Sequence, residues 1–231
     1  MSNFKDKLTE FWREWRGLVI FLVVMLLFRS AIADWNQVPT GSMKPTILIG
    51  DRVVVNKLAY DLKIPFTDWL LATWDTPKPG DIITFYSPKD EKLLIKRVIG
   101  LPGDIVAMLD NQLLINNKPS NYKALDQSIV NLIDEPERRE HRFYYEQLGG
   151  SEHPVMLSPT PPGHYNNFGP VKVPGGHYLV LGDNRDHSGD FRVIGFIESG
   201  RITGRAHTVA FSVDHDDYYL PRLGRFFHEL R

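Results

Sequence analysis

The sequence predicts a mainly β protein: a single N-terminal transmembrane helix followed by an exported, β-rich domain with a loop-rich insertion. The first observation is an uncharged apolar run, GLVIFLVVMLLF, at residues 17–28. The second is a series of short apolar runs after Asp34 that Gly and Pro separate, which is typical of strands. The third is a stretch, residues 118–170, that is rich in proline and polar clusters and contains one possible short helix near residues 124–133.

These features divide the chain into two parts. We expect a cytoplasmic tail and transmembrane anchor at residues 1–34 and one extracytoplasmic domain at residues 35–231. Within that domain, the strand-like runs place a core at residues 35–117 and 171–214, and the insertion occupies residues 118–170. A chain of this length can bury well over half of its unfolded surface in such a core.

The apolar run has the length and the flanks of a membrane span. As a helix, residues 17–33 would cover roughly 25 Å, close to the hydrocarbon thickness of about 30 Å, and Arg29 can reach the far headgroups. Interfacial aromatic residues and preceding basic residues flank the run: Trp12, Trp15 and Trp35, and Lys5, Lys7, Arg13 and Arg16. The positive-inside rule therefore predicts a cytoplasmic N-terminus and an exported remainder.

Two other interpretations of this run stay open. Its uninterrupted part is short enough for a buried core helix. The tripeptide Ala31-Ile32-Ala33 also resembles the A-x-A site at which a removable signal peptide is cleaved. Arg29, at the end of the apolar region, and the acidic residues of the leader argue against cleavage.

The predicted strands lie on both sides of the insertion. Each is a run rich in aliphatic or aromatic residues, and turn signals such as Pro79-Gly80, Pro102-Gly103 and Pro174-Gly175 separate several of them. The runs are Arg52–Val55, Asp81–Tyr86, Leu93–Ile99, Ile105–Met108, Gln112–Ile115, His177–Leu181 and Arg205–Phe211.

The composition excludes several classes of function. The formal net charge is −1, which gives no electrostatic attraction to nucleic acid, so we expect no nucleic-acid partner. The chain has no cysteine, which excludes a disulfide framework, a thiol nucleophile and a cysteine zinc site. The eight histidines lack close ligand spacing, so we expect no metal site and no cofactor.

A serine on a constrained loop follows the apolar run. The segment Val38–Thr46, VPTGSMKPT, places Ser42 after Gly41 and between Pro39 and Pro45. Prolines fix the backbone and glycine permits close approach. Such a loop can present a hydroxyl together with backbone N–H groups, as acyl transfer requires. The same residues also suit an ordinary turn.

A lysine lies inside an apolar strand-like run, Leu94–Ile99. If Lys96 points into the core, desolvation lowers the pKa of its amine, and a neutral amine is a competent general base. The lysine could equally be exposed on an edge strand. A shift of about 3 pKa units, or roughly 4 kcal/mol, would be needed for the amine to be neutral at pH 7.

A dense polar segment, Gly182–Arg192, lies between two strand-like runs. Asp186, Ser188 and Asp190 suggest a calcium loop, but Phe191 occupies the position of the required glycine and no glutamate follows at the twelfth position. A network of Asp–Arg pairs that braces a loop fits the segment better.

Together these segments resemble the bacterial type I signal peptidases, or leader peptidases. Four motifs occur in the family's order, after an apolar run that ends in Arg29-Ser30. The motifs are Thr40–Thr46 (TGSMKPT), Gly50–Lys57 (GDRVVVNK), Lys96–Asp104 (KRVIGLPGD) and Gly182–Ser188 (GDNRDHS), the last continuing through Asp190 and Arg192. The combination is far more specific than any one motif. It implies a membrane-bound serine endopeptidase whose β-rich catalytic domain removes signal peptides from exported preproteins after small residues (A-x-A) by a Ser-Lys dyad.

The resemblance also implies roles for single residues. Ser42 would be the nucleophile and Lys96 the base that activates it. The Ser42 N–H and the Thr40 hydroxyl would form the oxyanion hole; the family commonly has serine at position 40, and the methyl group of threonine restricts χ1. Ser188 would hydrogen-bond the Lys96 amine and orient it. The remaining assignments are structural braces and walls of the substrate pocket: Asp183, Arg185, Asp190 and Arg192, and Val38 and Ile95.

The implied partners are preprotein signal peptides and membrane lipid. The implied location is the bacterial inner (cytoplasmic) membrane, with a single pass, a cytoplasmic N-terminus and the catalytic domain on the outer, periplasmic side. Two apolar segments, residues 66–74 (FTDWLLATW) and the tail from Pro221, suit either lipid contact or a cap on the β-core.

Two other functions stay open. One is a self-cleaving Ser-Lys regulatory protease, although a membrane segment rather than a DNA-binding region precedes the serine motif. The other is an exported, anchored β-domain that binds partners or lipid without catalysis. That second function predicts an ordinary pKa near 10.4 for the Lys96 amine.

Overall fold

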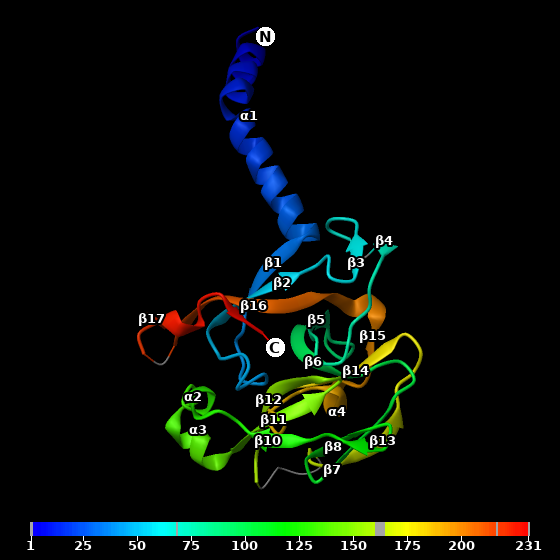
Figure 1. Cartoon of the computed structure of the whole chain (residues 1–231). Helices are drawn as coiled ribbons and strands as arrows, with labels where there is room; N and C mark the ends of the chain where they lie inside the picture. The colour runs from blue at the N-terminus through cyan, green and yellow to red at the C-terminus, as the bar shows by residue number, and fades with distance from the viewer. Residues whose placement is uncertain (1, 68, 160–164, 216, 231) are drawn as a thin grey trace.

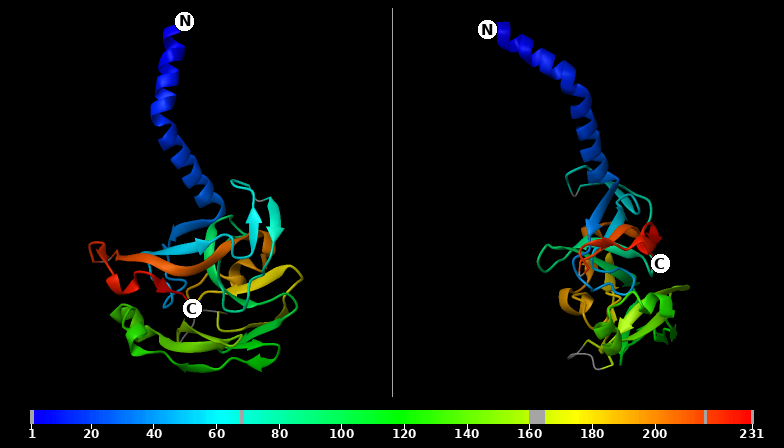
Figure 2. Two further views of the ribbon diagram at one scale, coloured as in Figure 1. Left: turned by 45° about the horizontal axis from the view of Figure 1, so that its top comes forward. Right: turned by 90° about the vertical axis from the view of Figure 1, so that its left-hand side faces the viewer.

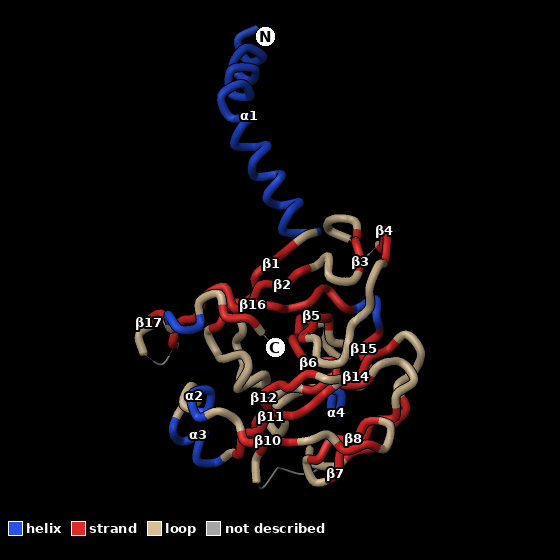
Figure 3. The backbone as a smooth tube through the Cα atoms, in the orientation of Figure 1, coloured by secondary structure: helices blue, strands red, loops and turns tan. Residues whose placement is uncertain are grey.

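The computed structural model describes residues 2–67, 69–159, 165–215 and 217–230. Eighteen strands and a few short helices form the body, and one long helix precedes it within this described part of the chain. The predicted mainly β class is therefore confirmed (Figure 3).

Helix α1 (Ser2–Ala31) extends away from the body of the molecule, as Figure 1 and the two views of Figure 2 show. Its side chains from Phe11 to Phe28 are exposed, so the alternative of a buried core helix is wrong. The Ile32 N–H donates a hydrogen bond to the Phe28 carbonyl at 2.8 Å, and the chain passes directly into β1. No helix among the described residues combines the length and the apolar character that crossing a bilayer requires.

The body is built on one large sheet in which neighbouring strands are antiparallel. The strand order is β1-β2-β16-β5-β6-β14-β15, with β17 and β18 paired to β16. The bounds are β1 (Ala33–Gln37), β2 (Asp51–Asn56), β5 (Ile82–Tyr86), β6 (Leu93–Gly100), β14 (His177–Leu181), β15 (Ile197–Glu198), β16 (Ile202–Asp214), β17 (Leu220–Pro221) and β18 (His228–Glu229). Strand β6 is thus an interior strand.

Two smaller sheets and three short helices extend this body. One sheet has the order β13-β7-β8-β9, and β3 pairs with β4 in a hairpin. The bounds are β3 (Asp61–Lys63), β4 (Leu70–Thr73), β7 (Ile105–Leu109), β8 (Gln112–Ile115), β9 (Lys118–Pro119), β13 (Phe168–Lys172), α4 (Phe191–Ile194), η1 (Ser199–Arg201) and η2 (Leu223–Arg225). All seven strands that the sequence predicts are present, two of them with the predicted bounds and the others with bounds that differ by at most three residues.

The two apolar segments of uncertain role differ in the structure. The β3–β4 hairpin leaves its large apolar side chains exposed, so it does not cap the β-core: Phe66, Trp69, Leu70, Leu71 and Trp74. The C-terminal tail instead pairs with β16 through β17 and β18, and it buries Arg225 against Asp51. The tail therefore belongs to the main sheet.

The prediction that the insertion at residues 118–170 is rich in loops is wrong, because strands and short helices make up most of it. This stretch forms a three-stranded sheet of β10 (Tyr122–Ala124), β11 (Arg142–Leu148) and β12 (Ser151–Leu157), with helices α2 (Gln127–Val130) and α3 (Glu135–Glu140). The alternation of β11 is hidden because it buries a carboxylate, Glu146, and β12 contains Pro154, which an edge strand tolerates. The predicted short helix is present as α2.

Candidate active site

The loop of residues 38–50 joins β1 to β2 and carries Ser42, the predicted nucleophile; it is called the nucleophile loop below. The Val38 N–H donates to the Asp51 carbonyl at 3.0 Å, and the Gly50 N–H donates to the Val38 carbonyl at 3.2 Å, so the two ends of the loop are held together. Within the loop, Met43 and Ile47 are fully buried in one apolar cluster. These buried apolar residues, which follow Ser42 in the chain, help to fix its position.

Lys96 reaches this loop from the interior strand β6. Lys96 is only 3% exposed, so the alternative that it is an exposed lysine on an edge strand is wrong. The Lys96 Nζ lies 2.7 Å from the Ser42 Oγ and 2.8 Å from the Ile95 carbonyl oxygen. The serine and the lysine, 54 residues apart, thus share a hydrogen bond in a buried position.

Burial lowers the pKa of the Lys96 amine from 10.5 to about 8, and the negative charges of Asp190 and Asp183 limit this shift. A depressed pKa of this size costs about 3 kcal/mol of folding stability at neutral pH. The sign follows from proton binding. Between pH 8 and 10.5 the unfolded chain holds a proton on this amine that the folded chain has released, so this cost disappears as the pH rises.

The structure does not contain the predicted hydrogen bond between Ser188 and the Lys96 amine. The Ser188 Oγ is buried, and it has no hydrogen-bond partner among the described residues. Ser188 nevertheless lies next to the nucleophile loop. A Cβ built on Gly182 would lie 2.2 Å from the Ser188 Oγ and 2.4 Å from the Ser42 carbonyl oxygen. Only a glycine leaves room for these groups to meet.

We therefore expect Gly182→Ala to reduce peptide cleavage about 100-fold, because the new methyl group must displace the Ser42 backbone, and displacements of about 1 Å cost this much. Steady-state cleavage rates of purified proteins provide the measurement. Gly189→Ala is the matched control, since a Cβ there meets no atom within 4 Å in the described structure. Equal rates for the two variants would contradict the argument.

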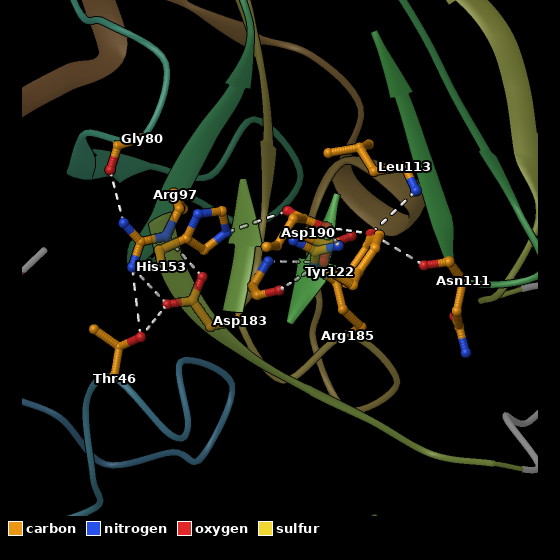
Figure 4. A network of polar contacts seen from close by, with 12 residues as sticks. Thr46, Gly80, Arg97, Asn111, Leu113, Tyr122, His153, Asp183, Arg185 and Asp190 are labelled. Carbon is orange, nitrogen blue, oxygen red and sulfur yellow. Dashed lines mark hydrogen bonds and ion pairs between the residues drawn. The ribbon is translucent and has the colours of Figure 1, made fainter. Parts of the chain in front are cut away.

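A buried ion pair holds the residue that follows the lysine. The Arg97 guanidinium donates to both carboxylate oxygens of Asp183, at 2.8 and 2.7 Å, and to the Gly80 carbonyl at 2.8 Å (Figure 4). The Thr46 hydroxyl donates to the same carboxylate at 2.5 Å. Burial alone would raise the pKa of Asp183, but Arg97 holds it below its usual value. This pair ties β6 to the segment after β14 and to the nucleophile loop.

A second buried ion pair joins the last motif to the insertion. Arg185 donates to the two oxygens of Glu146 on β11 at 2.7 and 2.5 Å, and the Tyr122 hydroxyl also donates to Glu146. His153 lies with its Nε2 3.2 Å from Glu146 and beside Arg97 (Figure 4). Burial and the Arg97 charge lower the pKa of His153, so the imidazole is neutral at pH 7. The insertion is thus bonded directly to the site.

The third ion pair closes the last motif on itself. The Arg192 guanidinium donates to both oxygens of Asp190 at 2.8 and 2.6 Å, and Asp190 accepts a hydrogen bond from the Gly182 N–H at 3.0 Å. Arg192 also donates to the Arg185 carbonyl. The four predicted brace residues are therefore all in ion pairs, but only Asp190 and Arg192 pair with each other; Asp183 and Arg185 pair with residues outside the motif.

The remaining predicted residues lie around the loop. Val38 is 3% exposed, and the partly buried Ile95 packs against the same apolar cluster. Thr40, which directly precedes Gly41, is exposed. Two residues of the site, Asn184 and Glu146, were not predicted from the sequence. Asn184 donates through its side chain to the Gly41 carbonyl and through its N–H to the Ser42 carbonyl, both at 3.2 Å. The motif contained Asn184, but nothing in the local sequence indicated Glu146.

This arrangement can perform acyl transfer. An alcohol oxygen lies 2.7 Å from an amine that burial makes easier to deprotonate, and both groups are shielded from bulk water. The neutral amine can accept the alcohol proton during attack on a carbonyl carbon and can return it to a leaving amine. Three buried ion pairs keep the surrounding segments in place.

The chain is similar to several known proteins. A family model described as signal peptidase, peptidase S26, matches residues 12–211. Signal peptidase I of Pseudomonas fluorescens is 34% identical over 204 residues, covering 83% of this chain and 69% of that relative. Signal peptidase I of Rickettsia bellii is 32% identical over 220 residues, covering 87% of this chain and 73% of that relative. A solved signal peptidase I of Enterococcus faecalis is 29% identical, covers 58% of this chain and 98% of its own, and has a TM-score of 0.35.

The family match covers most of the chain, including the nucleophile loop, β6 and the last motif. The chain therefore belongs to the signal peptidase family, peptidase S26.

Proposed function

We propose that this protein is a signal peptidase that cleaves exported preproteins with Ser42 as nucleophile and Lys96 as general base. The observation that carries the proposal is the 2.7 Å contact between the Lys96 Nζ and the Ser42 Oγ, made by a lysine that is 3% exposed. A lysine in this position has no evident structural use, since burial of its amine costs stability.

In the proposed reaction, the Ser42 Oγ attacks the carbonyl carbon of the scissile bond while its proton passes to the Lys96 Nζ. The protonated amine then donates this proton to the departing peptide nitrogen, which leaves an ester on Ser42. A water molecule, deprotonated by the same amine, hydrolyses the ester and restores the serine. The Ser42 N–H and the Thr40 hydroxyl are the proposed donors to the oxyanion.

The proposed substrate is a signal peptide with small residues at −1 and −3. Val38 and Ile95 belong to one aliphatic cluster beside the nucleophile loop, and aliphatic walls of this kind favour small side chains over large ones. We expect the purified protein to cut a preprotein once, after A-x-A. Replacing the −1 alanine by phenylalanine should lower kcat/KM at least about 100-fold, because the ring has no space. Mass spectrometry of the new N-terminus tests this; efficient cleavage after phenylalanine would refute it.

We also propose that residues 1–34 form a single-pass membrane anchor with a cytoplasmic N-terminus, and that residues 35–231 form a periplasmic peptidase domain at the bacterial inner membrane. The support is the exposed apolar surface of α1 from Leu18 to Phe28, together with the exposed side chains of the β3–β4 hairpin. Apolar surface of this extent is unfavourable in water and favourable in lipid.

If residues 1–34 form a membrane anchor, the full-length protein should bind phospholipid vesicles and float with them. A shortened protein that lacks residues 1–32 should lose most of this binding. The hairpin variant Trp69→Ala/Leu70→Ala should weaken the residual binding further, because it removes exposed apolar area. Vesicle flotation measures both effects. Equal binding by full-length and shortened protein would refute the anchor.

A further inference from the structure

A buried lysine lies two residues after the nucleophile. Lys44 is 8% exposed, and its Nζ contacts the Glu137 Oε2 at 2.5 Å. Glu137 lies on α3 in the insertion, 93 residues further along the chain. Neither residue has a role in the proposed reaction.

The lysine stem packs directly on the turn that presents Ser42. A Cβ built on Gly41 would lie 3.2 Å from both the Cδ and the Cε of Lys44, and the Lys44 N–H donates to the Gly41 carbonyl at 3.1 Å. On the same turn, Asn184 bonds to the carbonyls of Gly41 and Ser42. Lys44 and Asn184 therefore both donate to the Gly41 carbonyl, and the Lys44 side chain adds an ion pair to helix α3 of the insertion.

The insertion is itself fixed against the same loop. Leu48, at the end of the nucleophile loop, packs in one buried cluster with Ile133 and Met156 of the insertion. Ile133 lies just before α3, and the His141 Nδ1 contacts the Glu137 carbonyl at 2.7 Å at the other end of the helix. Contacts at both ends of helix α3 thus fix its position, so that Glu137 can hold the Lys44 ammonium.

The ion pair is asymmetric in burial, which determines what its loss should do. The Lys44 side chain is 10% exposed and that of Glu137 is 28% exposed. Removing the carboxylate leaves a largely buried ammonium without a charged partner, and such a group moves toward water rather than remain unpaired. Because the stem of Lys44 covers Gly41, that movement would release the turn.

We propose that Glu137 is a positioning residue for the peptidase reaction: through Lys44, it holds the turn at residues 41–44 so that the Ser42 Oγ stays within reach of the Lys96 Nζ. The inference rests on the proposed function for its kinetic consequence. It gives the insertion, residues 118–170, a part in catalysis without contact to the reacting atoms.

The test compares Glu137→Gln with Glu135→Gln in full-length protein. Glu135 lies on the same helix in an exposed pair with Arg139, so it is the matched control. For Glu137→Gln we expect kcat on an A-x-A peptide to fall about tenfold with KM within twofold of wild type, since misplacing a nucleophile affects the chemical step. The charge swap Lys44→Glu/Glu137→Lys should recover kcat to within threefold. Rates are measured well below each melting temperature, so that a purely structural loss does not register.

Three results would overturn the proposal: equal kcat for Glu137→Gln and Glu135→Gln, a change confined to KM, or a charge swap no better than the single variant. If the wild-type protein itself cleaves no preprotein, the proposed function fails, and amide hydrogen exchange then decides the positioning separately. Exchange across residues 41–47 should be about tenfold faster in Glu137→Gln than in Glu135→Gln. Equal exchange in the two variants would exclude the positioning role regardless of activity.

Discussion

Ser42→Ala and Lys96→Met should each reduce preprotein cleavage by at least about 1,000-fold while leaving the protein folded. The first variant removes the attacking oxygen. The second removes the only amine within hydrogen-bond distance of that oxygen in the described structure, and a methionine fills the same volume. Lys96→Arg should be equally inactive, because a guanidinium cannot give up its proton near neutral pH. Cleavage rates with a purified preprotein measure all three.

The matched control for the lysine is Lys92→Met. Lys92 lies just before β6, and its exposed side chain pairs with Asp90 near the surface. Its replacement should leave the rate unchanged, and thermal melting should show all variants folded. Lys96→Met should even melt several degrees higher than wild type, because the cost of burying the amine is removed. Wild-type rates in either Ser42→Ala or Lys96→Met would exclude the dyad.

Breaking the Arg97–Asp183 pair should produce the largest loss of stability. Both side chains are 1% exposed, so Arg97→Met leaves a buried carboxylate without its cation. Such changes cost about 3–5 kcal/mol. For a chain of this size that corresponds to a decrease of roughly 10 °C in melting temperature. Thermal unfolding followed by far-ultraviolet circular dichroism measures the decrease.

A double variant and a surface pair provide the controls. Arg97→Met/Asp183→Leu should lose less stability than Arg97→Met alone, because no unpaired charge remains. Arg201→Met, which breaks an exposed pair with Glu91, should cost less than about 1 kcal/mol. If Arg97→Met is no more destabilising than Arg201→Met, the buried pair does not contribute as argued.

The seven predicted strands were recognisable because their apolar runs match a two-residue period or are apolar throughout, whereas β1, β15, β17 and β18 of the main sheet were not predicted. The strands of the insertion were not predicted either. In β11 the buried position opposite His153 holds Glu146, which is stable there only because Arg185, 39 residues further on, neutralises it. No local rule anticipates a carboxylate whose partner lies elsewhere in the fold, so the local pattern predicts loops.

The active site was likewise predictable only in part. The residues of the family motifs were found, and local sequence alone left Lys96 either exposed or buried. Burial depends on β6 lying between β5 and β14, which is a property of the sheet order rather than of the run itself. The contacts of Ser188 were predicted wrongly, because its position follows from the turn around Gly182. The Lys44–Glu137 ion pair could not be predicted from the sequence, since the two residues do not belong to one motif.

The most direct test of this account is the pKa of the Lys96 amine in the folded protein. Protein labelled with ¹³C at lysine Cε would be titrated by NMR, and comparison with Lys96→Met would identify the resonance. The account predicts a midpoint near pH 8, the value to which burial lowers this amine. A midpoint near 10.5 would contradict it, because only about one amine in three thousand would then be neutral at pH 7, against about one in ten for a midpoint of 8.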